Sequence, residues 1–268
     1  MAVREPVVAG SFYPAEAPTL KRFCESYLKP RRGLVTAHAV LLPHAGYVYS
    51  GRTACETLAR VHVPDLVLLI GPNHHGWGAS FSMMTEGTWR TPLGEVPIDP
   101  GLAHALGKAS GELSDDPDAH AQEHSLEVEI PFLQTKNPSL RIVPLLIGTS
   151  DTARIRRVAQ QIGPLLASWP EKLLLVISSD MNHYESDAVT HRKDHKALAA
   201  IEKLDAEGLA ETVHRSKISM CGFAAAYLLL CMKGILPLTK ATVADYRTSG
   251  PVSGDLQRVV GYAGIIFE

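Results

Sequence analysis

Three short apolar segments of the sequence each run directly into histidine. They are Ala39–Pro43 before His44, Leu66–Asn73 before His74 and His75, and Leu173–Ser179 before Asp180 and His183. Apolar runs of this length, separated by segments with helical spacing, are typical of parallel strands buried on both faces. Because open α/β sheets bind ligands beyond the carboxyl ends of their strands, these imidazoles are expected to meet at one edge. Imidazole is the commonest metal ligand and titrates near neutrality, so the pattern predicts a metal or acid–base site.

The remaining sequence alternates strand and helix patterns. Further strands are expected at 141–147, 241–246 and 259–267, with an antiparallel excursion at 81–98. Helices are expected at 51–61, 99–109, 152–168, 187–203, 206–214 and 221–233. The sequence shows no internal repeat and no linker. It therefore predicts one α/β domain spanning residues 1–268, with a mixed, mostly parallel sheet flanked by helices.

Composition narrows the classes of function. The 268 residues carry a formal net charge of -2 without a basic stripe, which argues against a nucleic-acid partner. The longest apolar stretch, Phe223–Met232, is far shorter than the ~20 residues that cross a bilayer. The first residues lack the apolar core of a signal peptide, and the four cysteines form no Cys-x-x-Cys pair. A cytoplasmic protein with free thiols and no membrane partner is expected.

His44 is followed by two small residues, which let backbone and ligand approach each other closely. A histidine that caps the strand and bonds to a carbonyl group fits the same pattern. Of the adjacent pair His74 and His75, at most one is expected to face the site, because consecutive residues at a strand end point in opposite directions. The other is expected to act as a hydrogen-bonding group behind it.

Asp180 and His183 follow the third strand in the segment Ser178–Tyr184. A carboxylate buried after an apolar strand needs a partner, since an unpaired buried charge is costly. Asp180 is expected either to bind a metal or to orient an imidazole, by accepting a hydrogen bond from His183 or His75. The alternative is a cap for the next turn.

His124 and Glu127 are spaced to share one face of a helix expected to start at Glu123, although an exposed acidic helix start explains the same pattern. Cys221 lies where another helix is expected to begin, and helix N-termini lower the pKa of a thiol. We therefore expect Cys221 to be an exposed thiolate and the fastest cysteine to alkylate. A small buried apolar residue is the alternative.

Seven segments, in order and spread over nearly the whole chain, resemble the Memo family. They are Ala9–Pro14, Pro43–Gly51, Gly71–His75, Arg90–Gly94, Glu123–Glu127, Ser178–Tyr184 and Met220–Gly222. The resemblance implies a fold like that of class III, non-haem iron(II) extradiol dioxygenases. It also implies a metal bound by two histidines and one cysteine, which fall on His44, His75 and Cys221, with Asp180, His183 and His124 as catalytic residues in the same pocket. Those dioxygenases use a carboxylate where this chain has cysteine, which argues against ring cleavage.

Several functions remain open on this basis. Two imidazoles and a thiolate suit iron(II) or copper, and three ligands plus water would also suit zinc. The site could serve a dioxygenase-like or redox enzyme, a metal carrier without turnover, or an adaptor that binds a peptide in the cleft. The resemblance also implies AMMECR-type and radical-SAM partner proteins, because prokaryotic Memo proteins belong to the AmmeMemoRadiSam system. The small-molecule or peptide ligand is not indicated by any motif.

Overall fold

The central sheet is built on the three strands that lead into histidine. The computed structural model describes residues 2–29 and 33–268. In it β2 (Ala39–Leu42), β9 (Leu173–Ser178) and β3 (Leu66–Pro72) are neighbours and run parallel. Leu41 and Ile70 both pair with Ile177 in this register, so the carboxyl ends of the three strands lie side by side.

The sheet continues on both sides of these strands. β8 (Arg141–Ile147) runs parallel to β3, whereas β12 (Val259–Phe267) runs antiparallel to β2. The remaining strands lie toward the edges: β4 (Phe81–Met83) and β7 (Ser114–Asp115) beyond β8, and β10 (His183–Glu185) and β11 (Ala241–Thr248) against β12. The prediction of a mixed, mostly parallel sheet is confirmed.

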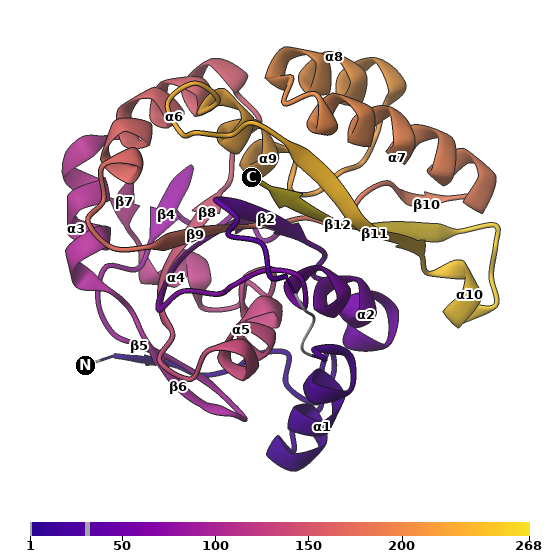
Figure 1. Cartoon of the computed structure of the whole chain (residues 1–268), viewed down its shortest axis with the longest axis horizontal. Helices are drawn as coiled ribbons and strands as arrows, with labels where there is room; N and C mark the ends of the chain where they lie inside the picture. Colours follow the sequence, from indigo (N-terminus) through magenta and orange to yellow (C-terminus); the bar gives the residue numbers. More distant parts are fainter. Residues whose placement is uncertain (1, 30–32) are drawn as a thin grey trace.

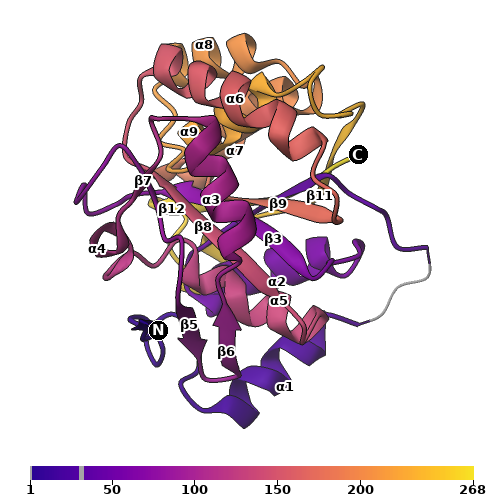
Figure 2. The ribbon, with the colours of Figure 1, turned by 90° about the vertical axis from the view of Figure 1, so that its left-hand side faces the viewer.

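Helices cover both faces of this sheet, because alternate side chains of each strand point to opposite layers. Leu66, Leu68 and Ile70 belong to one apolar cluster, and Val67 and Leu69 belong to the other. The first layer contains α3 (Pro100–Ala109), α6 (Thr152–Ala167), α7 (Asp187–Glu202), α8 (Ala206–Ser216) and α9 (Phe223–Cys231). The second contains α1 (Ala17–Tyr27), α2 (Tyr47–Leu58) and α5 (Ile130–Lys136). Figures 1 and 2 show α6, α8 and α9 on one side of the sheet and α1, α2 and α5 on the other.

A second, three-stranded sheet holds the N-terminal segment. It consists of β1 (Val3–Arg4), β5 (Thr88–Thr91) and β6 (Gly94–Pro97). Arg4 is buried, pairs with Glu127 at 2.7 Å and lies over the ring of Trp89. Glu127 also accepts a hydrogen bond from Tyr13 at 2.7 Å and from the backbone of Val7 and Val8. Glu127 therefore anchors the segment that leads to the functional site, instead of sharing a helix face with His124.

Some boundaries differ from those expected. The helix predicted at 51–61 begins four residues earlier, at Tyr47. No α-helix begins at Glu123: a turn leads into the 3₁₀ helix η1 (Glu127–Glu129), and α5 starts only at Ile130, with Pro131 in its first turn. The edge strand β10 and two single-turn helices, α4 (Pro117–His120) and α10 (Gly250–Ser253), were not predicted. Within residues 2–29 and 33–268, no helix is long and apolar enough to cross a membrane.

Candidate metal centre

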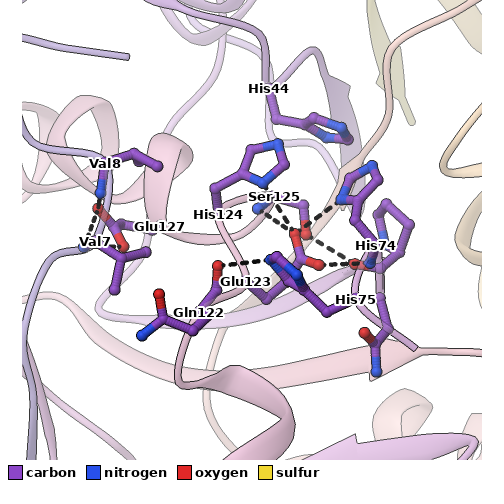
Figure 3. Close-up of polar contacts among 12 residues, drawn as sticks. Val7, Val8, His44, His74, His75, Gln122, Glu123, His124, Ser125 and Glu127 are labelled. Carbon is purple, nitrogen blue, oxygen red and sulfur yellow. Dashed lines mark hydrogen bonds and ion pairs between the residues drawn. The ribbon is translucent and has the colours of Figure 1, made fainter. Parts of the chain in front are cut away.

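Three side chains with metal-binding atoms meet beyond the carboxyl ends of the central strands. His44 follows β2, His74 follows β3, and Cys221 lies just before α9. Their ligand atoms all lie within 4.8 Å of one another, and His44 Nε2 is 3.2 Å from Cys221 Sγ. Figure 3 shows the rings of His44 and His74 gathered at one place. The structure thus brings together two imidazoles and a thiol from parts of the chain almost 180 residues apart.

His44 is held from behind by the last residue of β9. Its Nδ1 lies 2.7 Å from the hydroxyl oxygen of Ser178, and its side chain is buried. Burial lowers the pKa of His44 well below its ordinary value, and the neighbouring histidines act in the same direction. His44 is therefore a neutral imidazole whose Nε2 faces Cys221.

His74 is held by a buried carboxylate. Glu123 accepts hydrogen bonds from His74 Nδ1 at 2.9 Å, from its backbone N–H at 2.5 Å and from the backbone of Ser125 at 2.8 Å. Burial opposes the ionisation of Glu123, but the hydrogen bond and charge of His74 outweigh it and hold the pKa of Glu123 at about 2. Carboxylates in this position fix the tautomer of a metal-binding histidine and raise its basicity. His74 Nδ1 is committed to Glu123, which leaves Nε2 for a metal.

The assignment of a metal ligand to His75 is not supported by this geometry. Both histidines are exposed, but His75 Nε2 lies 3.0 Å from the carbonyl oxygen of Gln122, and its ring lies beside that of Trp77. Figure 3 shows His75 turned toward Gln122 and away from His44. One histidine of the pair faces the site, as expected, but it is His74, because Glu123 binds both the backbone and the ring of that residue.

Cys221 also differs from the expectation. It lies two residues before the first residue of α9, Phe223, and is half-buried against the end of β9. Gly222 makes this approach possible, since a Cβ atom there would lie 2.3 Å from the carbonyl oxygen of Ser178. Burial, together with the charge of Asp180, raises the pKa of the Cys221 thiol. Without a metal, Cys221 is therefore a half-buried thiol and not an exposed thiolate.

Asp180 lines the site without binding an imidazole. Its Oδ1 accepts a hydrogen bond from the backbone N–H of His44 at 2.9 Å, and its own N–H donates to Cys221 Sγ at 3.1 Å. Burial raises the pKa of Asp180 to about 7. The expected hydrogen bond from His183 or His75 is absent, because the side chain turns toward the neighbouring strand end. Asp180 joins the ends of β9 and β2 and positions both His44 and Cys221.

His183 lines the cavity with its imidazole ring. Its Nδ1 lies 2.9 Å from the carbonyl oxygen of Ser219 and therefore carries the proton. Burial lowers the pKa of His183, so the ring is neutral near pH 7 and its Nε2 can accept a proton.

The turn that carries His183 is fixed from α7. Buried Asp194 accepts hydrogen bonds from the backbone of Asn182 at 2.9 Å and from Tyr246 at 2.7 Å. The side chain of Asn182 in turn accepts a hydrogen bond from the backbone of Ser219. Asp194 therefore supports the position of His183 through two intervening residues.

His124 completes a cluster of imidazoles. Its ring stacks on His74 with centroids 4.7 Å apart and meets Phe12 edge-on at 4.8 Å. Burial lowers the pKa of His124 to about 4, despite the opposing charge of Glu123 3.4 Å from its Nδ1. The side chains of His74, Glu123 and His124 are also close enough together to bind a metal ion. The Glu123 carboxylate, however, already accepts hydrogen bonds from His74 and Ser125. It therefore acts as the partner of His74 and not as a second metal site.

These residues line a cavity of about 770 Å³. His44, His74, His124, His183, Asp180 and Cys221 form its floor, and aromatic side chains form much of its wall: Phe12, Tyr49, Tyr184 and Tyr262. No lysine or arginine lines it among the residues that the structure describes. Tyr184 has a positive φ of 61°, a strained conformation of the kind found at functional sites. The cavity can hold a small organic ligand against the cluster.

Sequence reasoning missed three residues of this site. His74 belongs to the predicted pair, but the family resemblance places the ligand on His75, and no sequence pattern gives Glu123 or Ser178 a role in the site. Glu123 follows no strand and belongs to no ligand-spacing motif, so only the fold places it beneath His74. Ser178 reads as the end of an apolar strand, and nothing in the sequence shows that its hydroxyl points at His44.

The comparisons with known proteins agree with the arrangement of these segments. The family model described as "Memo-like protein" matches residues 4–266. The chain belongs to the Memo family. MEMO1 family protein MK0963 of Methanopyrus kandleri is 38% identical, with 99% of each chain covered. The Aquifex aeolicus member is 38% identical over the whole of both chains, and the Archaeoglobus fulgidus member is 39% identical over 99% of this chain and 100% of its own.

A solved structure supports the fold alone. The crystal structure of uncharacterized protein JW3007 from Escherichia coli K12 matches with a TM-score of 0.55 at 14% sequence identity. The match covers 84% of this Memo-family chain and 98% of the other. The mixed α/β architecture is therefore shared with a protein of very different sequence.

Glu123→Gln is expected to weaken metal binding roughly 10–100-fold, because it removes the charge that orients His74 and raises its basicity. Asp180→Asn keeps an oxygen for the backbone N–H of His44 and is expected to have a smaller effect. Competition with a chelator measures the metal affinities of the two variants. Their unfolding temperatures must first show that both are folded. A larger loss of metal affinity in Asp180→Asn than in Glu123→Gln would indicate that Asp180, and not Glu123, orients the metal-binding histidine.

Asp194 gives a pH-dependent contribution to stability. Burial raises its pKa from 3.8 to about 6, so between about pH 4 and pH 6 the folded protein keeps a proton that the unfolded chain has lost. This contribution to stability therefore falls as the pH rises through that window. Asp194→Asn is expected to match the wild type near pH 4 and to gain roughly 1–3 kcal/mol relative to it above about pH 7. Urea unfolding at both pH values measures the difference in unfolding free energy between Asp194→Asn and the wild type. A difference that does not change with pH would contradict the prediction.

Proposed function

We propose that this Memo-family protein binds iron(II) or copper through His44, His74 and Cys221 and uses it as a non-haem redox centre. The observation that supports the proposal is the convergence of three ligand atoms within 4.8 Å, on side chains held from behind. Ser178 and Glu123 occupy the Nδ1 atoms of His44 and His74, so both histidines offer Nε2. Hydrogen-bond partners of this kind are what metal-binding histidines require.

The chemistry of the three groups fits such an ion. Imidazole and thiolate together favour iron or copper, with the soft thiolate favouring Cu(I), and zinc is also compatible. A metal takes the deprotonated form of cysteine, so binding must remove the Cys221 proton. The backbone N–H of Asp180, 3.1 Å from Sγ, is placed to stabilise the resulting thiolate.

The cavity residues support chemistry on a bound ligand. An iron or copper ion would supply electron transfer and a Lewis-acidic centre. His183 has its Nδ1–H committed to the Ser219 carbonyl oxygen, so its Nε2 can take a proton from a hydroxyl group of a ligand. Neutral His124, which lines the same cavity, can serve the same purpose. The aromatic side chains would bind the apolar part of the ligand and exclude water from it.

Tag-free protein purified without oxygen provides the test. It is expected to contain close to one iron or copper per chain, and to lose it in His44→Ala. Catechols and other phenols are then offered to the same sample. His183→Ala should keep the metal but lose turnover, because His183 is not a ligand.

The outcomes separate the alternatives. Bound metal without turnover would favour a metal carrier, which could deliver the ion to an AMMECR-type or radical-SAM partner. Peptide binding that survives His44→Ala would favour an adaptor that uses the cleft alone. Absence of any metal from the purified protein, together with no uptake on reconstitution, would reject the proposed function.

A further inference from the structure

Glu129 is a buried carboxyl group that the proposed metal chemistry does not use. It lies in η1 and is fully buried. Its Oε1 is 3.3 Å from the hydroxyl oxygen of Ser178, and its Oε2 is buried without a hydrogen-bond partner. A buried polar atom without a partner is uncommon in a folded protein and needs a reason.

Counting protons around Ser178 gives that reason. The Ser178 hydroxyl oxygen lies 2.7 Å from the carbonyl oxygen of Ser125, 2.7 Å from His44 Nδ1 and 3.3 Å from Glu129 Oε1. A hydroxyl has one proton, and the Ser125 carbonyl can only accept, so the proton belongs on that bond. Any other choice would leave two unprotonated oxygens facing each other at 2.7 Å in a buried site. His44 must then donate its Nδ1–H to Ser178.

The same count fixes the state of Glu129. With the Ser178 proton given to Ser125, an ionised Glu129 would face the Ser178 oxygen with no proton between them and would be a buried charge without a partner. A protonated Oε1 instead donates to Ser178 and leaves only a neutral carbonyl oxygen unpaired. Burial, with the charge of Asp180, raises the pKa of Glu129 well above its ordinary value and agrees with this count.

We propose that Glu129 is a positioning residue for His44: as a neutral carboxylic acid it donates to Ser178 and keeps His44 Nδ1–H directed at the same hydroxyl. His44 is then locked with Nε2 toward Cys221. The functional part of this inference rests on the proposed metal site, whereas the hydrogen bonds themselves exist without a metal.

The two histidines are consequently unequal. His74 donates a hydrogen bond to the ionised carboxylate of Glu123, which makes its imidazole a stronger metal ligand. His44 donates instead to the neutral hydroxyl of Ser178, which also accepts a hydrogen bond from the neutral Glu129. His44 is therefore the less basic imidazole of the pair, and its ligand strength depends on the orientation that Ser178 and Glu129 give it. The negative charge around a bound cation would come from the Cys221 thiolate, the Glu123 carboxylate behind His74 and, above about pH 7, Asp180.

Infrared spectroscopy of the metal-free protein tests the state of Glu129. At about pH 8, Asp180 and Asp194, whose pKa values are about 7 and about 6, are mostly ionised. A carbonyl stretch of a protonated carboxylic acid is expected to remain and to vanish in Glu129→Gln. Absence of this band in the wild type, or its persistence in Glu129→Gln, would overturn the proposal.

A pair of variants separates positioning from packing. Glu129→Leu removes the unpaired oxygen and is expected to be at least as stable as the wild type, yet to shift the ¹⁵N resonances of His44 and to bind iron(II) about 10-fold more weakly. Glu129→Gln keeps an N–H donor for Ser178. It is therefore expected to have His44 ¹⁵N resonances and an iron(II) affinity close to those of the wild type. If Glu129→Leu leaves the His44 resonances and iron(II) affinity unchanged, Glu129 only fills space.

The two proposals fail in different ways. Wild-type protein that takes up no iron or copper would reject the metal site, and the infrared band and the ¹⁵N resonances would then decide the role of Glu129 alone. Wild-type protein that binds metal with unchanged affinity in Glu129→Leu would reject the positioning role and leave the metal site in place.

Discussion

His74→Ala will lose metal binding, and His75→Ala will keep it. Apparent binding free energies of zinc sites with four ligands are about 10–16 kcal/mol, or roughly 3–4 kcal/mol for each ligand, which corresponds to about 10²–10³ in affinity. His74 contributes one of three ligand atoms in the cluster and is fixed by Glu123. Within the described part of the chain, the ring of His75 instead makes its hydrogen bond with the carbonyl oxygen of Gln122. Anaerobic titration with iron(II) against a competing chelator measures both affinities.

The two variants are matched controls, because they remove the same side chain from adjacent positions. Circular dichroism and the unfolding temperature must show that both fold, since His74 also neutralises part of the charge of Glu123. A loss of affinity in His75→Ala with His74→Ala unaffected would restore the ligand set that the family resemblance implied. Equal losses in both would indicate that the loop, and not one imidazole, supports the site.

The sequence was sufficient to locate the site but not to choose between these neighbours. Apolar runs ending at His44, at the His74–His75 pair and at Asp180 predicted parallel strands with their ends at one edge, and β2, β9 and β3 are arranged in that way. Which histidine turns inward depends on Glu123, about 50 residues further along the chain. No local pattern connects those two segments, so only the folded chain decides it.

Long-range contacts also explain the errors at Asp180 and Cys221. Asp180 was expected to orient an imidazole, but it accepts the backbone N–H of His44 because β9 and β2 are neighbours. For Cys221 the expected effect of a helix N-terminus was outweighed by burial. A helix dipole contributes at most about 2 kcal/mol, whereas burying a charged group costs several kcal/mol. The balance between these effects depends on how tightly Gly222 lets the chain approach β9, which the sequence alone does not show.

Regular elements were predicted best where local signals suffice. The helix expected at 152–168 is α6, and Asp151 caps it by accepting hydrogen bonds from Ala153 and Arg154. The helix expected to start at Glu123 failed because Glu123 and Glu127 are both drawn into buried hydrogen bonds with distant segments. Tertiary hydrogen bonds of this segment therefore override its helical spacing.

Cys221→Ser is expected to weaken the binding of Cu(I) by at least the 10²–10³-fold estimated for one ligand, about 3–4 kcal/mol. Serine nearly preserves the shape of the side chain but replaces a soft thiolate with a hard hydroxyl group that stays protonated. The loss should be larger for Cu(I) than for zinc, because Cu(I) depends more strongly on soft ligands. Titration of both ions against chelators of known affinity measures the difference.

Cys231→Ser is the matched control for this variant. Cys231 is half-buried like Cys221 and is the last residue of α9, the helix that follows Cys221. Within the described part of the chain it belongs to neither group of potential metal ligands. The affinity of the Cys231→Ser variant for Cu(I) should equal that of the wild type. The raised pKa of Cys221 also predicts slow alkylation of the metal-free protein, so fast labelling cannot serve as the diagnostic. Unchanged Cu(I) affinity in Cys221→Ser would remove the thiolate from the site and leave His44 and His74 as the candidate ligands of that cluster.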